Sequence, residues 1–116
     1  MIGDLTKRKD NERIVEELSA LADQIDIGMI VNNAGISNSV SPFLKVDVET
    51  IKNSFEINFF APYLINRALI PKMRKRKERS AIMNFSSITG AFISHQVGVY
   101  PASKQLLDIY SRATSE

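Results

Sequence analysis

The stretch AIMNFSSITGAFISHQVGVYPASK, residues 81–104, decides the fold and directs the interpretation of the rest of the chain. It begins as a short apolar run that leads into the hydroxyls of Ser86 and Ser87, as when a buried strand delivers polar groups to its carboxyl end. Tyr100 and Lys104 follow four residues apart, so a helix would place both on one face. A nearby ammonium lowers the pKa of a phenol from its ordinary value near ~10. The stretch therefore predicts a proton-transferring tyrosine, with the Ser87 hydroxyl holding a substrate oxygen.

The composition is that of a globular domain. The chain has 116 residues, of which 44% are apolar and 24% charged, within the range of one small domain. It contains no cysteine, which excludes a disulfide framework and a thiolate metal site, and we expect no metal. No apolar run approaches the ~20 residues of a membrane helix, and we see no signal peptide before Gly3.

The charge is concentrated in one segment. Residues 72–79 contain six basic residues and one acid, so the remainder carries a net charge of −3 although the whole chain is +2. We expect this basic segment to be a solvated connector, with contact to an anionic membrane surface as the alternative. Nucleic acid is not expected as a partner, because the remaining surface is acidic.

The first half of the chain predicts a helix followed by a strand. Residues 10–24 have apolar side chains at three- and four-residue spacing, with Asp10 or Asn11 available as the cap. Residues 27–31 form a continuous apolar run, typical of a strand covered on both faces. The run ends in Asn32-Asn33-Ala34-Gly35, and residues 36–46 have loop composition.

The second half repeats this order. Residues 48–73 have a helical pattern that Asp47 would cap, and Pro62 should kink or break the helix nearby. Residues 81–86 predict the second strand, residues 88–98 a loop, and residues 99 to at least 114 a third helix. Two parallel strands joined by helices indicate part of a doubly wound α/β sheet whose other strands lie outside this chain.

In combination, these motifs resemble the short-chain dehydrogenase/reductase family, classical type. Asn32 to Gly35 is similar to the family's strand-four motif. Ser87 lies thirteen residues before Tyr100, and Lys104 follows as in the family's catalytic set. The sequence of residues 27–33 is similar to that of the branch of steroid dehydrogenases and very-long-chain 3-oxoacyl-CoA reductases. The family's two remaining site positions match Asn58, in the middle of the long helix, and Asp4.

The resemblance implies a Rossmann-like fold of which this chain is the central fragment, with two central strands and three helices. Residues 1–116 would be the middle of a single NAD(P)-binding domain. The family's Gly-rich phosphate-binding turn would lie upstream, and its later strands and substrate lid downstream.

The resemblance also implies a reaction: hydride transfer between NAD(P)H and a carbonyl or alcohol substrate, with steroid or fatty-acyl substrates favoured. Tyr100 would be the general acid or base, and Lys104 would promote its proton transfer and bind the nicotinamide ribose. Ser87 would hydrogen-bond the substrate oxygen. Asn58, through a water, would connect Lys104 to solvent.

The cofactor would be NADP or NAD, with NADP favoured. Asn32, Ala34 and Gly35 would line the cofactor ribose, where glycine permits close approach of the backbone. Asp4 would contact the adenine. Taken alone, Asn58 fits a kink or capping group better, and Asp4 a solvated side chain; the order of all the motifs along the chain favours the family.

Other hypotheses remain open. The chain is alternatively a catalytically silent remnant that pairs subunits through the helices at 48–73 and 99–116, which the resemblance also makes the interface of a homodimer or homotetramer. The protein would be cytoplasmic or associated with the endoplasmic reticulum membrane. His95, the single histidine, would be a surface or structural residue, with a place facing substrate as the second interpretation.

Overall fold

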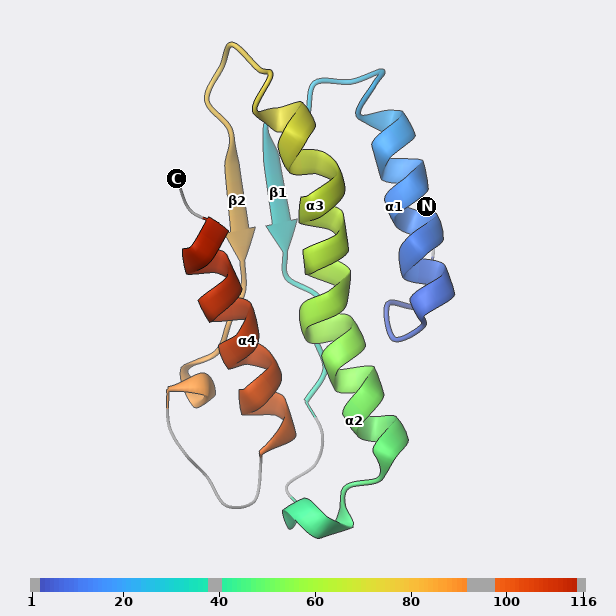
Figure 1. Cartoon of the computed structure of the whole chain (residues 1–116), viewed down its shortest axis with the longest axis vertical. Helices are drawn as coiled ribbons and strands as arrows, with labels where there is room; N and C mark the ends of the chain where they lie inside the picture. Colours follow the sequence, from blue (N-terminus) through green and yellow to red (C-terminus); the bar gives the residue numbers. More distant parts are fainter. Residues whose placement is uncertain (1–2, 38–40, 92–97, 115–116) are drawn as a thin grey trace.

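The structure is a computed structural model that describes residues 3–37, 41–91 and 98–114 (Figure 1). Two parallel strands lie side by side, in register from the pair Met29–Ala81 to the pair Asn32–Asn84. This arrangement confirms the predicted α/β fold of two parallel strands and three helical segments. The elements are α1 (Arg8–Leu21), β1 (Met29–Asn32), η1 (Phe43–Lys45), α2 (Val48–Phe55), η2 (Glu56–Phe60), α3 (Ala61–Met73), β2 (Ala81–Asn84), η3 (Ile88–Gly90) and α4 (Val99–Thr114).

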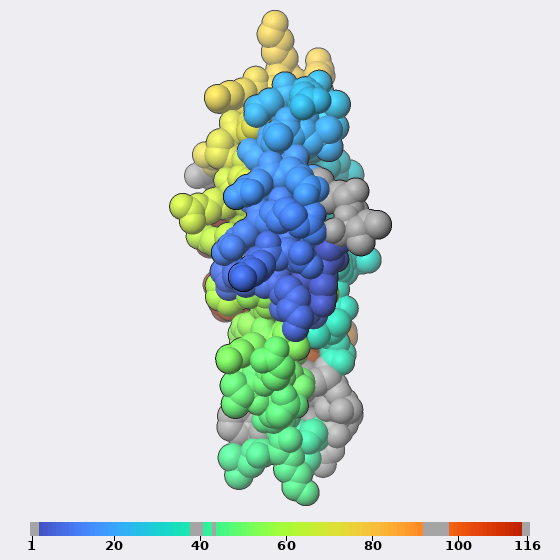
Figure 2. All heavy atoms as spheres, turned by 90° about the vertical axis from the view of Figure 1, so that its right-hand side faces the viewer, coloured from blue at the N-terminus to red at the C-terminus, as the bar shows by residue number. Residues whose placement is uncertain are grey.

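The helices cover only one face of this small sheet. Ile30 of β1 is buried against Leu69 and Met73 of α3, and side chains of α1 complete this core. Met29 and Val31, on either side of Ile30, point to the opposite face of the sheet and are each 52% exposed. The molecule is a slab of 48 × 28 × 16 Å, and Figure 2 shows its narrow side, with α1 in front. The expectation that both strand faces are covered is therefore not met within this chain.

Helix α1 begins two residues earlier than the sequence pattern predicts. The helix starts at Arg8, and its N-cap, Lys7, makes no capping bond through its side chain. The expectation that Asp10 or Asn11 caps the helix is wrong, because the Asp4–Lys7 turn already leads the chain into it. Asp10 lies in the first turn, where its carboxylate accepts a hydrogen bond from the Asp4 amide, and Asn11 is buried.

The long helix at 48–73 contains one irregular turn. Asp47 caps its start as predicted, accepting bonds from the amide and the hydroxyl of Thr50. Residues 56–60, η2, form a π-helical turn, and the Ala61 amide bonds to the Glu56 carbonyl five residues back. Pro62 follows at once, and it lacks the amide hydrogen that would bond the Asn58 carbonyl in an α-helix. The predicted irregularity near Pro62 is thus a π turn within a continuous helix.

Aromatic side chains join the long helix to α4. The ring centroids of Phe59 and Tyr63 lie 5.9 Å and 5.3 Å from that of Tyr110. These contacts pack the aromatic side chains of the long helix against α4. Burial raises the pKa of Tyr110, as expected for a phenol taken out of water.

The basic segment is partly engaged within the fold. Lys72 donates to the Ser19 carbonyl at the end of α1 and pairs with Asp23. Arg76 pairs with Asp26 just before β1. Lys72 therefore fixes α3 to the end of α1, Arg76 fixes the segment after α3 to the one before β1, and the basic segment is more than a solvated connector. No helix in the described parts of the chain is long and apolar enough to cross a membrane.

Candidate active site

The π turn brings Asn58 into a fixed position between two other segments. Its side chain is fully buried, and its Nδ2 donates to the Ile36 carbonyl and to Ser103 Oγ, both at 2.9 Å. Its Oδ1 accepts from the Ile36 amide, also at 2.9 Å. The two bonds to Ile36 hold the loop that follows β1, and the three together fix how the amide is oriented. π turns of this kind occur frequently at functional sites.

Helix α4 carries the next part of the site. Ser103, fully buried, accepts from Asn58 and donates through Oγ to the Tyr100 carbonyl at 2.8 Å. Lys104 is only 4% exposed, and its Nζ lies 6.0 Å from the centroid of the Tyr100 ring. The structure thus places the phenol and the ammonium side by side on one helix, with Asn58 connected to their backbone through Ser103.

The end of β2 holds the Lys104 ammonium. Nζ donates to the Phe85 carbonyl at 2.8 Å, and Ser86 Oγ donates to the Lys104 carbonyl at 2.9 Å. Burial lowers the pKa of Lys104, because desolvation disfavours its charged form. An ammonium has three N–H donors, so after the Phe85 bond it retains donors for the ribose hydroxyls of a nucleotide.

Gly35 completes the surroundings of this ammonium. A Cβ atom built at residue 35 would lie 2.9 Å from Asn58 Oδ1 and 3.0 Å from Lys104 Nζ. The sequence analysis explained this glycine by the close approach of a cofactor. The packing gives a second reason, because a side chain at residue 35 would crowd Asn58 and Lys104. The residues present fit the sugar of a nicotinamide cofactor: an exposed loop, a buried cation with spare donors and a neighbouring half-buried tyrosine.

Ser87 is the N-cap of η3, three residues after the end of β2. Its Oγ lies 2.8 Å from Thr89 Oγ1 and accepts from the Thr89 amide at 3.3 Å. The η3 turn packs against α4, since a Cβ at Gly90 would lie 3.2 Å from the side-chain oxygen of Gln105. The strand predicted over residues 81–86 ends at Asn84, so Ser87 lies in the turn beyond it, with its hydroxyl engaged by that turn.

Asn32 has contacts that the sequence did not predict. Its Nδ2 donates to Asn66 Oδ1 of α3 at 2.9 Å and to Asn84 Oδ1 of β2 at 2.7 Å. Asn84 then donates to Ser111 of α4 at 2.9 Å. The Asn32 side chain thus joins the two strands to two helices, while Ala34 is exposed at the end of β1.

Asp4 lies in the turn before α1, outside the group around Lys104. Its carboxylate accepts from the amide and the hydroxyl of Thr6 at 2.9 Å and 2.7 Å, and these bonds lower the pKa of Asp4. The side chain is exposed and could receive a ligand. His95 lies outside the described residues. Among the described residues, no group of three or more histidine, aspartate or glutamate side chains is arranged to hold a metal ion.

Two residues in these contacts were missed by the sequence analysis. Ser103 bridges Asn58 to α4, and Ile36 receives the Asn58 amide through its backbone. A signal for Ser103 was present, because a small polar residue directly before Lys104 lies on the helix side facing the long helix. The sequence carried no signal for Ile36, whose contribution is its peptide group.

Known proteins resemble this chain along most of its length. The model of the family described as short chain dehydrogenase matches residues 1–116, the whole chain. A very-long-chain 3-oxoacyl-CoA reductase of Neurospora crassa is 31% identical over 108 residues, covering 92% of this chain and 32% of the relative. A diacetyl reductase [(S)-acetoin forming] of Staphylococcus epidermidis is 28% identical over 114 residues, covering 98% of this chain and 43% of the relative.

Solved structures share the fold. The bulky-bulky ketone specific alcohol dehydrogenase from Comamonas testosteroni matches with a TM-score of 0.84 at 24% identity, over 97% of this chain and 43% of that one. A short-chain dehydrogenase from Streptomyces avermitilis matches with a TM-score of 0.81 at 27% identity, over 97% and 41%. The chain spans about a third of the length of the first curated relatives. From the match along its entire length, the chain belongs to the short-chain dehydrogenase family.

Proposed function

We propose that residues 1–116 are the central part of a single NAD(P)-binding domain in an oxidoreductase. This enzyme transfers a hydride between the nicotinamide cofactor and a carbonyl or alcohol substrate. The Gly-rich unit that binds the pyrophosphate and the strands and lid that complete the substrate site lie outside this segment in the proposal. The full-length protein is the longest natural chain that contains these residues.

One observation supports the proposal most strongly: the buried Lys104 ammonium lies beside the Tyr100 ring at the end of the strands. Burying a cation is costly unless hydrogen bonds compensate, and the hydrogen bond to the Phe85 carbonyl uses only one of the three donors of the ammonium. Open α/β sheets bind ligands at the carboxyl ends of their strands, which is where this group lies. The arrangement is therefore one that a bound ribose would complete.

Each side chain has a distinct part in the proposed reaction. The cofactor supplies the redox step when it is bound. Tyr100 donates the phenol proton to the substrate oxygen in reduction and accepts it in oxidation. Ser87 hydrogen-bonds the same oxygen and stabilises the charge that develops on it. Lys104 binds the ribose hydroxyls and favours the loss of the phenol proton through its charge.

The remaining residues position these groups. Asn58 fixes the loop after β1 and, through Ser103, the backbone at Tyr100. Its backbone carbonyl, which Pro62 cannot bond, would hold the water that leads protons from Lys104 to solvent. In the proposal Asn32, Ala34 and Gly35 line the ribose, and Asp4 contacts the adenine. NADP is favoured over NAD.

The proposed substrate class is a steroid or fatty-acyl carbonyl compound. The similarity to proteins named very-long-chain 3-oxoacyl-CoA reductase supports the fatty-acyl choice, and the protein named diacetyl reductase keeps a small ketone in consideration. The proposed location is the cytoplasm or the surface of the endoplasmic reticulum membrane. Residues 72–79 would provide the membrane contact, with Lys75, Lys77 and Arg79 exposed.

The test uses the full-length protein with NADPH and NADH in separate titrations. A 3-oxoacyl-CoA, a steroid ketone and diacetyl serve as substrates for turnover. Tyr100→Phe removes the proton donor and should reduce kcat by roughly 100-fold or more while cofactor binding persists. Tyr110→Phe, the same change on the same helix, is the matched control. Failure of the full-length protein to bind either cofactor would reject the proposal.

A second candidate is a subunit-pairing module. Leu106 and Ile109 of α4 are 37% and 56% exposed, and Phe60 at the end of the π turn is 36% exposed, so both helices present apolar surface. We propose this surface as the contact of a homodimer or homotetramer. Leu106→Glu with Ile109→Lys should shift the protein to monomer in sedimentation. A dimer that binds neither NADPH nor NADH would favour a purely pairing role.

Contact with a membrane is tested separately. Charge reversal at Lys75 and Lys77 should abolish binding to vesicles that contain anionic lipid, because each basic residue near the surface contributes about 1 kcal/mol. These two positions avoid Lys72 and Arg76, whose ion pairs with Asp23 and Asp26 hold the fold together. Binding that is unaffected by the reversal would exclude the contact.

A further inference from the structure

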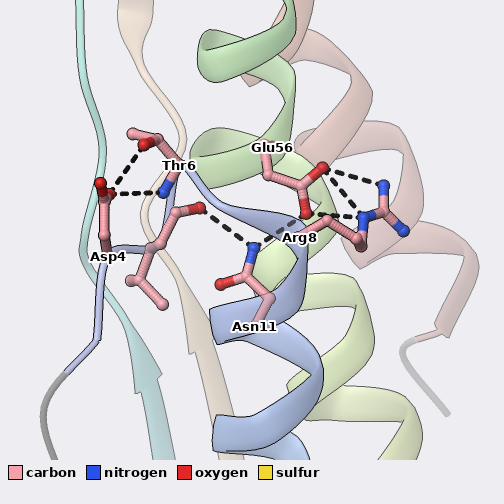
Figure 3. Close-up of polar contacts among 6 residues, drawn as sticks. Asp4, Thr6, Arg8, Asn11 and Glu56 are labelled. Atoms are coloured by element: carbon pink, nitrogen blue, oxygen red, sulfur yellow. Dashed lines mark hydrogen bonds and ion pairs between the residues drawn. The ribbon is translucent and has the colours of Figure 1, made fainter.

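Three side chains from two helices meet where the π turn begins (Figure 3). Arg8 and Asn11 come from the first turns of α1, and Glu56 is the first residue of η2. Glu56 is only 9% exposed and Asn11 1% exposed. A buried carboxylate needs charged or hydrogen-bonding partners, and both are supplied by α1.

The Arg8 guanidinium holds the Glu56 carboxylate and the end of the same turn. Its Nε lies 2.8 Å from Glu56 Oε1, and Nε and Nη2 donate to Oε2 at 3.1 Å and 2.9 Å. Its central carbon also lies 4.4 Å from the centroid of the Phe60 ring, a cation–π contact. Because Glu56 and Phe60 are the first and last residues of η2, one arginine contacts both ends of the π turn.

Asn11 connects this turn to the loop that contains Asp4. Its Nδ2 donates to Glu56 Oε1 at 2.8 Å and to the Leu5 carbonyl at 3.0 Å. Its Oδ1 is buried and has no hydrogen-bond partner among the described residues. The unpaired oxygen is unfavourable, so the stabilising contribution of this buried amide comes from its two donor contacts.

We propose that Arg8, Asn11 and Glu56 are positioning residues that maintain the π turn and, through it, the orientation of Asn58. They also join this turn to the Asp4 loop, so the adenine contact and the Tyr100 site become coupled parts of one assembly. The coupling to catalysis rests on the function proposed above, whereas the control of the π turn does not. A π turn contains one residue more than the α-helical ladder, so its relaxation would rotate Asn58 by about 100°.

Glu56→Gln is the principal variant, because it removes the charge and keeps the size of the side chain. Asn11→Leu removes both donor contacts at nearly constant volume. Glu17→Gln is the matched control, because Glu17 forms an exposed ion pair with Arg13, at 2.7 Å, on the same helix. All variants are made in the full-length protein.

The first measurement is independent of any activity. Hydrogen exchange at the Ile36 amide reports the Asn58 position, because this amide donates to Asn58 Oδ1. In Glu56→Gln and Asn11→Leu we expect exchange at Ile36 to accelerate by roughly tenfold or more. The Phe85 amide, which donates to the Asn32 carbonyl between the strands, should exchange at its original rate. Unchanged exchange at Ile36, or equal acceleration at both amides, would overturn the proposal.

The second measurement concerns the reaction. Glu56→Gln should reduce kcat by about 10- to 100-fold and raise the KM for the cofactor, with the KM for the carbonyl substrate nearly constant. Glu17→Gln should leave all three parameters unchanged. If the unmodified full-length protein binds no cofactor, the proposed function fails, and the exchange at Ile36 still decides the role of the three residues. A normal kcat in a Glu56→Gln protein with accelerated Ile36 exchange would overturn the coupling to catalysis.

Discussion

Asn58 and Asn66 are the same residue type on the same long helix, eight residues apart, but their hydrogen bonds connect different parts of the molecule. Both are buried, at 0% and 1% exposure. Asn58 bonds mainly to the backbone of the loop after β1 and to Ser103 of α4. Asn66 accepts from Asn32 and donates to Asn84, at 2.9 Å and 3.3 Å, so it bonds to side chains of the two strands.

The two asparagines differ in local helix geometry and in whether their partners can form hydrogen bonds without them. Asn58 lies in the π turn and bonds to the Ile36 peptide groups and Ser103, whereas Asn66 lies in regular α3. If Asn66 is lost, Asn32 and Asn84 still bond one another at 2.7 Å. Burial of an amide therefore does not measure its importance; the alternatives open to its partners do.

The largest effect should come from Asn58→Leu. The change leaves the Ile36 amide and carbonyl and the Ser103 hydroxyl without the Asn58 amide, and each buried group left unpaired costs about 1–3 kcal/mol. Partial relaxation should bring the total loss of unfolding free energy to about 2–4 kcal/mol, measured by urea denaturation of the full-length protein. In the proposed enzyme, turnover should fall as well. A loss below about 0.5 kcal/mol would remove the distinction between the two asparagines.

Gly35→Ala should perturb the same place from the opposite side. The added methyl group would lie 2.9 Å from Asn58 Oδ1 and 3.0 Å from Lys104 Nζ, which requires the lysine tip or the loop to move. We expect a loss of about 1–3 kcal/mol in unfolding free energy.

Gly98→Ala is the control for this change, because a Cβ at residue 98 meets no atom of the described residues within 4 Å. Calorimetry on both variants should show a lowered melting temperature for Gly35→Ala alone. Equal melting temperatures would mean that the space beside Lys104 adapts without strain.

Asn66→Ala should have a smaller effect. The direct bond between Asn32 and Asn84 remains, so we expect a loss of about 1–2 kcal/mol in unfolding free energy. In the proposed enzyme, kcat per folded molecule should stay close to that of the unmodified protein. Denaturation and turnover measured on one preparation separate the two effects, and a fall in kcat as large as for Asn58→Leu would contradict the comparison.

The smallest effect concerns pH. The pKa of Lys104 is lowered by burial from its ordinary 10.5, so the folded protein binds fewer protons at this group than the unfolded chain does. The free energy of unfolding should therefore rise with pH between the lowered pKa and 10.5. Below this pH window, the buried and charged Lys104 destabilises the fold most. Lys104→Met should abolish this rise, as measured by denaturation across the alkaline range. Lys52→Met, at an exposed site, should retain it.

Much of the fold follows from local sequence patterns. The apolar runs predict both strands, the four-residue spacing places Tyr100 and Lys104 on one face, and Asp47 is recognisable as a cap. These features depend on side-chain periodicity and on contacts within one turn, which a sequence displays directly. The sheet face left uncovered by the described residues was not expected. An apolar run indicates that a strand is buried, but it does not indicate which segment covers the strand.

The sequence by itself determined the order of the elements, the parallel pairing and the residues presented at the strand ends. Only the tertiary structure decided that Asn11 is a buried link, that Glu56 starts a π turn, and that Ser103 receives the Asn58 amide. The Asn11–Glu56 and Asn58–Ser103 hydrogen bonds join segments about 45 residues apart, and the sequence around a polar residue does not indicate which distant residue it will bond to. Such contacts become visible only when the packing of the helices has fixed the distance between the groups.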